Sequence, residues 1–123
     1  MLTDGSRVRL SGRELDAGGD WARILASDAA GRVVGRVAYA RVYGPRAELT
    51  LGVDDAYWDC GLGEALLARL RANAAQHGIA TLLARVRASD VRLLALLRRA
   101  GAIGETASGG RIDIELPARP PTG

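Results

Sequence analysis

The sequence predicts a mixed α/β (α+β) fold in which helices cover a central sheet. Residues 21–53 alternate apolar and polar side chains with the period of two that is typical of strands. Residues 61–77 then place Leu or Ala at every fourth position, as in an amphipathic helix. The chain has 123 residues, 48% of them hydrophobic, which is enough for the core of one domain. We therefore expect a single domain over residues 1–116, followed by a flexible proline-rich tail over residues 117–123.

The first half of the chain is predicted to form an antiparallel meander. The expected strands are 21–27, 32–43 and 46–53, which are rich in Val, Leu and Tyr and are joined by short turns. Gly35 lies inside the second of these strands, where a glycine indicates a β-bulge or a close approach of the backbone. A further short strand can form near residues 6–11, where apolar and polar residues alternate.

The second half is predicted to alternate helices with strands and to end in a β-hairpin. The expected elements are a helix over 61–77, a strand over 79–87, a helix between Ser89 and Gly101, and short strands over 102–106 and 111–116. Ser89 is expected to cap the second helix with its hydroxyl group. The buried stripe of that helix has two alternatives, which are Val91, Leu94 and Leu97 or Leu93, Leu96, Leu97 and Ala100. The strands on either side of the first helix must pair in parallel, so the full order is β-β-β-α-β-α-β-β.

The composition disfavours several classes of protein. No apolar run is long enough for a membrane span, and we expect no signal peptide because the N-terminus lacks an apolar segment. Cys60 is the only cysteine, so neither an internal disulfide nor a zinc site built from cysteines is expected, and a reducing cytoplasmic location follows. The net charge is +3 and no lysine is present. Few aromatic residues lie among the arginines, so a nucleic-acid adaptor is the least favoured function.

The motif G-L-G at residues 61–63 lies in a loop between a predicted strand and a predicted helix. Glycines at a helix N-terminus let backbone N–H groups approach a phosphate, so the loop can hold an anion. It lacks the third glycine of a dinucleotide-binding fingerprint and the lysine of a P-loop. The alternative is a helix start whose glycines allow tight packing. Composition and spacing leave both interpretations open.

The segment from V-D-D-A-Y-W-D-C-G-L-G-E to L-L-R-R-A-G, residues 53–101, resembles the core of the GNAT superfamily of acyl-CoA-dependent N-acyltransferases. Within that superfamily, A-E-L-T-L-G-V before the loop and L-L-R-R-A-G after it are most similar to bacterial Pat-type protein lysine acetyltransferases. The resemblance extends roughly over residues 21–116. It implies a GNAT fold that lacks most of the usual N-terminal helices, because only residues 12–20 lie between the first two strands.

The resemblance also implies acetyl-CoA as the cosubstrate, no metal, and an amine acceptor that attacks the thioester directly. The end of the strand before the loop would pair with the pantetheine arm, and a backbone N–H near Val53 would polarise the acetyl carbonyl. Backbone amides of the loop would hold the pyrophosphate. The implied cofactor-binding residues are Leu51, Gly52, Val53, Cys60, Gly61, Leu62, Gly63, Glu64 and Asp90.

Glu48 is the implied general base, because it matches the strand glutamate that has this role in Pat-type enzymes. Such a base must reach the acceptor amine and have a pKa near the working pH. The alternative is a solvated glutamate paired with Arg46 or Arg36. His77, the only histidine, is interpreted as a helix-end residue, and Cys60 as a packed or exposed thiol rather than a reactive one.

The loop departs from the family pattern in several places. Trp58 stands where the family has Arg or Gln, and Asp90 stands where it has an asparagine. Asp59 and Glu64 add negative charge, which weakens the binding of a pyrophosphate. We therefore expect an acetyl-CoA-dependent N-acetyltransferase that acts on an amine, with a protein lysine as the favoured acceptor. The alternative is a non-catalytic GNAT-like domain that binds acyl-CoA or is regulatory. A homodimer through the terminal strands is a further expectation.

Overall fold

The computed structural model describes residues 9–13 and 20–119 of the chain. The strands are β1 Arg9–Arg13, β2 Trp21–Ser27, β3 Val33–Tyr43, β4 Arg46–Val53, β5 Thr81–Arg87, β6 Gly104–Ser108 and β7 Arg111–Pro117. The helices are the 3-10 helix η1 Asp55–Cys60, α1 Leu62–Gln76 and α2 Val91–Arg99. The expected order of strands and helices is therefore confirmed, with β1 in place of the short strand predicted near residues 6–11. Residues 6–8 of that prediction lie outside the described residues.

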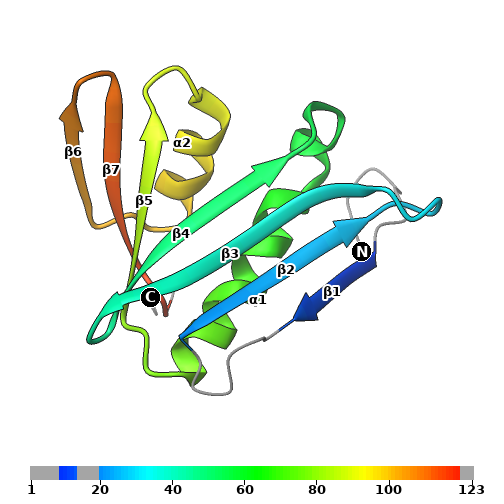
Figure 1. Ribbon diagram of the computed structural model, residues 1–123. Coiled ribbons are helices and arrows are strands. Elements are labelled where there is room, and N and C mark those ends of the chain that lie inside the picture. The colour runs from blue at the N-terminus through cyan, green and yellow to red at the C-terminus, as the bar shows by residue number, and fades with distance from the viewer. Residues whose placement is uncertain (1–8, 14–19, 120–123) are drawn as a thin grey trace.

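All seven strands form one mixed sheet in the order β1-β2-β3-β4-β5-β7-β6. The pairs from β1 to β4 are antiparallel, which confirms the predicted meander. β4 and β5 pair in parallel, because the chain crosses from one to the other through η1 and α1. The terminal hairpin of β6 and β7 adds antiparallel strands beside β5. The parallel pair therefore lies inside the sheet, with the meander on one side and the hairpin on the other (Figure 1).

Both α-helices lie on the same face of the sheet, behind the strands in Figure 1. α1 packs against β2, β3 and β4, and its buried leucines meet the inward-facing residues of those strands. The fully buried core includes Val37, Tyr39, Leu66, Leu70 and Leu97. Among the described residues, no helix covers the opposite face, and we call this the open face. The alternation of buried and exposed residues along β4 follows from this one-sided covering.

Gly35 in β3 allows α1 to approach the sheet closely. A Cβ atom at this position would lie 3.0 Å from Leu66 Cδ1 and 3.2 Å from Leu62 Cδ2, so a larger residue would require these two leucine side chains to shift. The neighbouring ladder between β2 and β3 also shifts register between Ala26 and Ser27. The glycine predicted to mark a bulge or a close approach is therefore found beside both.

The second helix corrects two sequence predictions. Asp90, not Ser89, caps α2, since its carboxylate accepts a hydrogen bond from Leu93 N–H at 3.3 Å. Ser89 was the wrong choice because a carboxylate one position later reaches the same donors. The expected stripe that included Val91 is also wrong, because Val91 is 67% exposed. The buried residues of α2 are Leu94, Leu96 and Leu97, which combine the two predicted stripes.

The last strand, β7, continues past residue 116, where the sequence predicted the end of the domain. Pro117 is the last residue of β7, and Ala118 is buried, with its N–H donating to Ala80 O at 2.9 Å. Arg71, on α1, donates to the carbonyl groups of both residues. Hydrogen bonds therefore hold Pro117 and Ala118 against the sheet and α1, whereas residues 120–123 of the expected tail lie outside the described residues.

Candidate functional site

The strands β4 and β5 separate part-way along the sheet. Their parallel pairing runs from Arg46↔Thr81 to Leu49↔Ala84 and ends there, although both strands continue. The two ribbons diverge visibly beyond this point (Figure 1). We call this opening the split. In a protein interior, strand edges left open in this way invite another extended chain to pair with them.

Backbone groups of β4 point into the split. Asp54 N–H donates to Val34 O on β3 at 2.9 Å. Backbone N–H groups along a strand point alternately to its two edges, so Val53 N–H and Leu51 N–H point away from β3 and toward the split. These donors lie beyond the last pair with β5, at Leu49. The strand residues predicted to bind an extended cofactor arm thus offer free backbone groups at the right edge.

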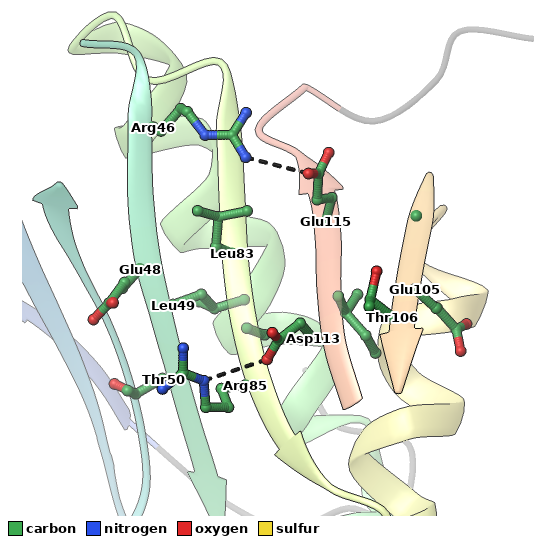
Figure 2. A pocket seen from close by; sticks show the side chains of 13 residues that line it. Arg46, Glu48, Leu49, Thr50, Leu83, Arg85, Glu105, Thr106, Asp113 and Glu115 are labelled. Carbon is green, nitrogen blue, oxygen red and sulfur yellow. Dashed lines mark hydrogen bonds and ion pairs between the residues drawn. The ribbon is translucent and has the colours of Figure 1, made fainter. Parts of the chain in front are cut away.

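On the open face, the split borders a hollow of about 600 Å³. We call it the Glu48 hollow. Its lining comes from β4, β5, β6 and β7, and mixes charged side chains with apolar ones such as Leu49 and Leu83 (Figure 2). It includes Arg46, Glu48, Thr50, Leu83, Arg85, Glu105, Asp113 and Glu115. The predicted base therefore lies at the wall of a solvent-open depression large enough for a side chain.

Glu48 is the one acid of this hollow without an arginine partner among the described residues. Arg46 Nη2 lies 3.2 Å from Glu115 Oε1, and Arg85 Nε lies 3.3 Å from Asp113 Oδ1. In Figure 2 the first pair spans from Arg46 on β4 to β7 and the second joins β5 to β7, while Glu48, farther along β4, takes part in neither. Among the described residues, no ion pair joins Glu48 to Arg46 or to Arg36, so the pairing in the alternative interpretation is wrong, while its solvated glutamate agrees with the exposure of Glu48. The Glu48 side chain is exposed on the open face.

A second hollow of about 420 Å³ lies at the wide end of the split. We call it the Trp58 hollow. It is lined by Leu51, Gly52, Val53, Asp55, Trp58, Ser89, Asp90, Val91 and Arg92. The structure thus brings together the strand end and Asp90, which the sequence predicted as cofactor-binding. The glycines of the loop do not line this hollow.

The loop begins α1 with a left-handed glycine. Gly61 has φ 86° and ends η1 while it caps α1. The first backbone bond into the helix is from Ala65 N–H to Gly61 O, at 3.1 Å. The N–H groups of residues 62–64 come before this bond, so they are the donors that a helix N-terminus leaves for an anion. Leu62 is buried in the core and Glu64 is exposed, so any contact to a ligand uses their backbone.

Cys60 and Gly63 have structural roles in this loop. Cys60 is 2% exposed, and its thiol donates to Tyr57 O at 3.1 Å, in agreement with a packed thiol. A Cβ atom at Gly63 would lie 3.1 Å from Leu96 Cδ2 and 3.5 Å from the Trp58 ring. A larger residue at Gly63 would require Leu96 to shift, so this glycine favours close packing of α2 against the helix start. The packing interpretation of the glycines is correct for Gly63. This packing leaves the N–H groups of residues 62–64 available, so both interpretations of the loop are compatible.

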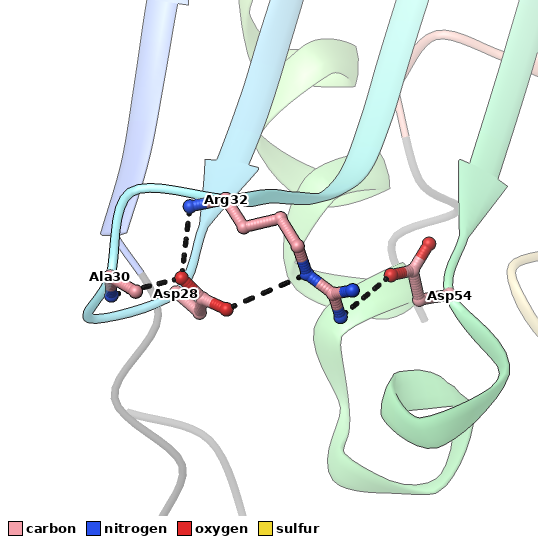
Figure 3. A network of polar contacts seen from close by, with 4 residues as sticks. All are labelled: Asp28, Ala30, Arg32 and Asp54. Carbon is pink, nitrogen blue, oxygen red and sulfur yellow. Dashed lines mark hydrogen bonds and ion pairs between the residues drawn. The ribbon is translucent and has the colours of Figure 1, made fainter.

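Each of three acids near the loop faces an arginine. Arg32 Nη2 lies 3.3 Å from Asp54 Oδ2, and Figure 3 shows it reaching from the turn between β2 and β3. Asp28 fixes that turn by accepting hydrogen bonds from the N–H groups of Ala30 and Arg32. The other two arginines come from α2 and pair with Asp55 and Glu64. These pairs offset part of the negative charge that the sequence placed beside the loop.

The comparisons with known proteins decide the family. The sequence model of the acetyltransferase (GNAT) family matches residues 6–102. The chain belongs to the GNAT family. No curated protein sequence is similar enough to this chain to count as a match.

Solved structures agree with this assignment at the level of the fold. The GNAT domain of S. lividans PAT superposes with a TM-score of 0.81 at 17% identity, covering 94% of this chain and 93% of that one. A putative acyl-CoA N-acyltransferase from Klebsiella pneumoniae gives 0.76 at 18% identity, with coverage of 91% and 98%. A cAMP-binding acyltransferase from Mycobacterium smegmatis gives 0.74 at 24% identity, and this chain spans 34% of it. The predicted GNAT fold and family are confirmed.

The single histidine of this GNAT domain and its buried tyrosine, Tyr39, have structural roles. His77 follows the last residue of α1, and its Nδ1 lies 2.9 Å from Asn73 O, as expected for a helix-end residue. Tyr39 is buried and donates to Asn73 Oδ1 at 2.9 Å. Among the described residues, no cluster of His, Cys, Asp and Glu could hold a metal, and no helix is long and apolar enough to span a membrane.

Sequence reasoning missed the arginines that surround the loop. Arg32, Arg92 and Arg99 each contact an acid that is distant in the chain. One signal was available, because Arg92 and Arg99 are seven residues apart on a predicted helix and therefore share a face. Their partners on η1 and α1 could be identified only from the packing of α2.

Proposed function

We propose that this GNAT domain is an N-acetyltransferase that transfers the acetyl group of acetyl-CoA to an amine by direct attack. The observation that carries the proposal is the split between β4 and β5. It joins a row of free backbone donors to a hollow whose wall holds an unpaired carboxylate, Glu48. GNAT membership supports acyl transfer, because the family model matches residues 6–102 and so includes both strands that form the split.

In this proposal the free edge of β4 binds the pantetheine arm. Leu51 and Val53 would supply the N–H and C=O groups, in the manner of an added strand. Gly52 lies between them, and Asp90 lines the Trp58 hollow together with these three residues. The N–H groups of Gly61, Leu62, Gly63 and Glu64 would bind the pyrophosphate at the start of α1, with Cys60 as packing support. PaiA N-acetyltransferase from Thermoplasma acidophilum, solved in complex with coenzyme A, shares this fold at 19% identity and a TM-score of 0.71.

The chemistry requires a neutral amine and a polarised carbonyl. Glu48 would take the proton of the acceptor ammonium, directly or through one water molecule. Val53 N–H, which points into the split, would donate to the carbonyl oxygen as negative charge develops there. Acetyl-CoA supplies an activated thioester, so the protein needs no covalent intermediate. No tyrosine is present on α2, so the leaving thiolate would be protonated by solvent or by the released proton.

The open face supports a protein lysine as the acceptor. A small-molecule site is usually enclosed on most sides. The Glu48 hollow instead opens to solvent, and no helix among the described residues covers it. A lysine side chain can extend its ammonium group to Glu48 while its own protein remains outside. A homodimer through the edge strands β1 and β6 is a separate proposal that would leave this face open.

A non-catalytic acyl-CoA-binding or regulatory domain is the second candidate. The observation that favours it is the acidic surroundings of the loop, where Asp59 has no arginine partner among the described residues. Such a domain would bind acyl-CoA weakly and show no turnover. It differs from the enzyme in one measurable property, which is whether Glu48 matters.

The test is turnover of Glu48→Gln with acetyl-CoA and a set of unstructured peptides that each carry one lysine. We expect turnover to fall about 100-fold, because general base catalysis typically contributes that much or more. Acetyl-CoA affinity, measured by calorimetry, should remain within about twofold of the wild type, since removing a charge at the acceptor side leaves the loop intact. Glu48→Asp keeps the carboxylate and should recover part of the rate. Wild-type binding without turnover would establish the second candidate instead.

A further inference from the structure

One face of α2 lies along the loop between η1 and α1. Arg92, Leu96 and Arg99 are spaced four and three residues apart, so their side chains share this face. Leu96 packs against Gly63, because a Cβ there would lie 3.1 Å from Leu96 Cδ2. The two arginines therefore lie on either side of the point where α2 touches the first turn of α1. Arg99 reaches Glu64 in the first turn of α1, and Arg92 reaches Asp55 at the start of η1.

Arg92 is the arginine that lines the Trp58 hollow, together with the strand end and Asp90. Its ion pair with Asp55 is long, with Nη1 and Oδ1 3.6 Å apart, and the two side chains are 52% and 97% exposed. An exposed pair of this length contributes little to stability. A phosphate oxygen in the hollow can replace Asp55 at small cost, because a guanidinium group binds phosphate with two parallel hydrogen bonds.

Arg92 occupies an unfavourable position for the helix alone. It lies in the first turn of α2, where the helix dipole repels a positive charge. Asp90 caps the helix by accepting a hydrogen bond from Leu93 N–H, and this is the only hydrogen bond of its side chain to the positive end of the dipole among the described residues. A bound anion in the hollow would make the cation favourable. Among the residues that line this hollow, Arg92 is the only basic one. Trp58, on the loop side, stands at the position where the family pattern has Arg or Gln.

We propose that Arg92 binds a phosphate group of acetyl-CoA and supplies the positive charge that the loop lacks at Trp58. The inference rests on the proposed function and names the residue that recognises the nucleotide half of the cosubstrate. Binding exchanges the ion pair with Asp55 for contacts with the phosphate. Arg99 remains beside Glu64, with Nη2 and Oε2 3.7 Å apart, and lowers the repulsion at the first turn of α1.

The test compares Arg92→Gln with Arg98→Gln in chemical-shift titrations of the whole chain. Arg98 is on the same helix and gives the same change in charge, but it donates to Glu105, on the far side of α2. We expect Arg92→Gln to weaken acetyl-CoA binding about tenfold, as for the loss of a charged hydrogen bond. It should leave the affinity for S-acetylpantetheine, which has no phosphate, unchanged. Arg98→Gln should change neither affinity by more than about twofold.

A second variant tests the exchange of partners. Asp55→Asn frees Arg92, so acetyl-CoA should bind a few times more tightly, and this gain should be absent in the double variant with Arg92→Gln. The inference is overturned if Arg92→Gln binds acetyl-CoA like the wild type, if it weakens S-acetylpantetheine equally, or if the gain persists in the double variant. If the wild type binds no acetyl-CoA at millimolar concentration, the proposed function fails as well. If the wild type binds acetyl-CoA and Arg92→Gln binds it equally well, the proposed function survives and this inference alone fails.

Discussion

At the scale of single residues, Gly61 determines how the chain passes from η1 into α1. Its φ of 86° lies in the left-handed region, and a Cβ atom there would meet nothing within 4 Å. Gly61→Ala should therefore destabilise the domain through backbone strain alone, by about 1–2 kcal/mol. Gly61→Asn should cost less, because asparagine tolerates this conformation. Urea unfolding without ligand measures both, and an equal cost for Ala and Asn would show that strain is not the cause.

The residues of the site differ in how far the sequence could predict them. Glu48 and the strand end were predicted from the resemblance to GNAT enzymes, and the structure brings them to one split. Arg92 was missed, because its position matters only once α2 packs on the loop. Trp58 was identified as a departure from the family, but its contact with Gly63 came from packing that no local pattern encodes. Whether these residues bind and catalyse stays a prediction.

At the scale of elements, Arg71 joins α1 to the ends of α2 and β7. Its guanidinium donates to Ala100 O at 2.9 Å, Pro117 O at 2.7 Å and Ala118 O at 3.3 Å, and the residue is 6% exposed. Burial lowers the pKa of Arg71 from its usual value, but an arginine stays protonated at any ordinary pH. The three carbonyl groups have this one charged donor in common.

Arg71→Met should therefore destabilise the domain by about 2–4 kcal/mol, because it leaves buried carbonyl groups without a donor. Arg71→Lys keeps the charge but has no planar fork, so it should recover only part of that loss. The midpoint of urea unfolding measures the order of the three proteins. A methionine variant with a wild-type midpoint would show that water satisfies these carbonyl groups equally well.

An ion pair between Arg98 on α2 and Glu105 on β6 should make the stability of the domain depend on pH. Arg98 donates two hydrogen bonds of 2.9 Å to Glu105, and these bonds, followed by the charge of Arg98, lower the pKa of the carboxyl below its usual 4.5. A lowered folded pKa stabilises the fold above the unfolded pKa, and the contribution is lost as the pH falls through the folded value. The wild type should therefore exceed Glu105→Gln in stability above about pH 4.5 and lose that advantage at lower pH. Denaturation at a series of pH values checks this, and a difference independent of pH would contradict it.

The elements themselves were largely predictable, because each has a strong local signal. The alternation in β4, the four-residue repeat of α1 and the glycines that end the helices all act within a few residues. The errors lie where side chains compete or where distant groups decide. Asp90 displaced Ser89 as the cap of α2, and the buried Ala118 depends on Arg71 and Ala80, which are remote in the sequence.

At the scale of the whole molecule, the two sides of the sheet have different tasks. One side carries both α-helices and nearly all of the core, so it provides the stability of the fold. The other side carries no described helix, and it contains the Glu48 hollow, which the split borders. A ligand in the split would therefore contact both layers at once, since the strand end lies in the sheet and the loop begins a helix. Binding there should stabilise the molecule as a unit.

Acetyl-CoA should thus raise the melting temperature of the domain. At a ligand concentration of 100 times Kd, binding to the folded state alone adds about 2.7 kcal/mol. For a chain of 123 residues this corresponds to a rise of roughly 10 °C. S-acetylpantetheine at the same concentration should give a smaller rise, because it occupies the strand edge but not the helix start. A thermal-shift titration measures both, and the Gly61→Glu variant, which places a carboxylate at the loop, should lose the effect of acetyl-CoA. An unchanged melting temperature at millimolar acetyl-CoA would mean that this GNAT domain keeps the fold but does not bind the cosubstrate.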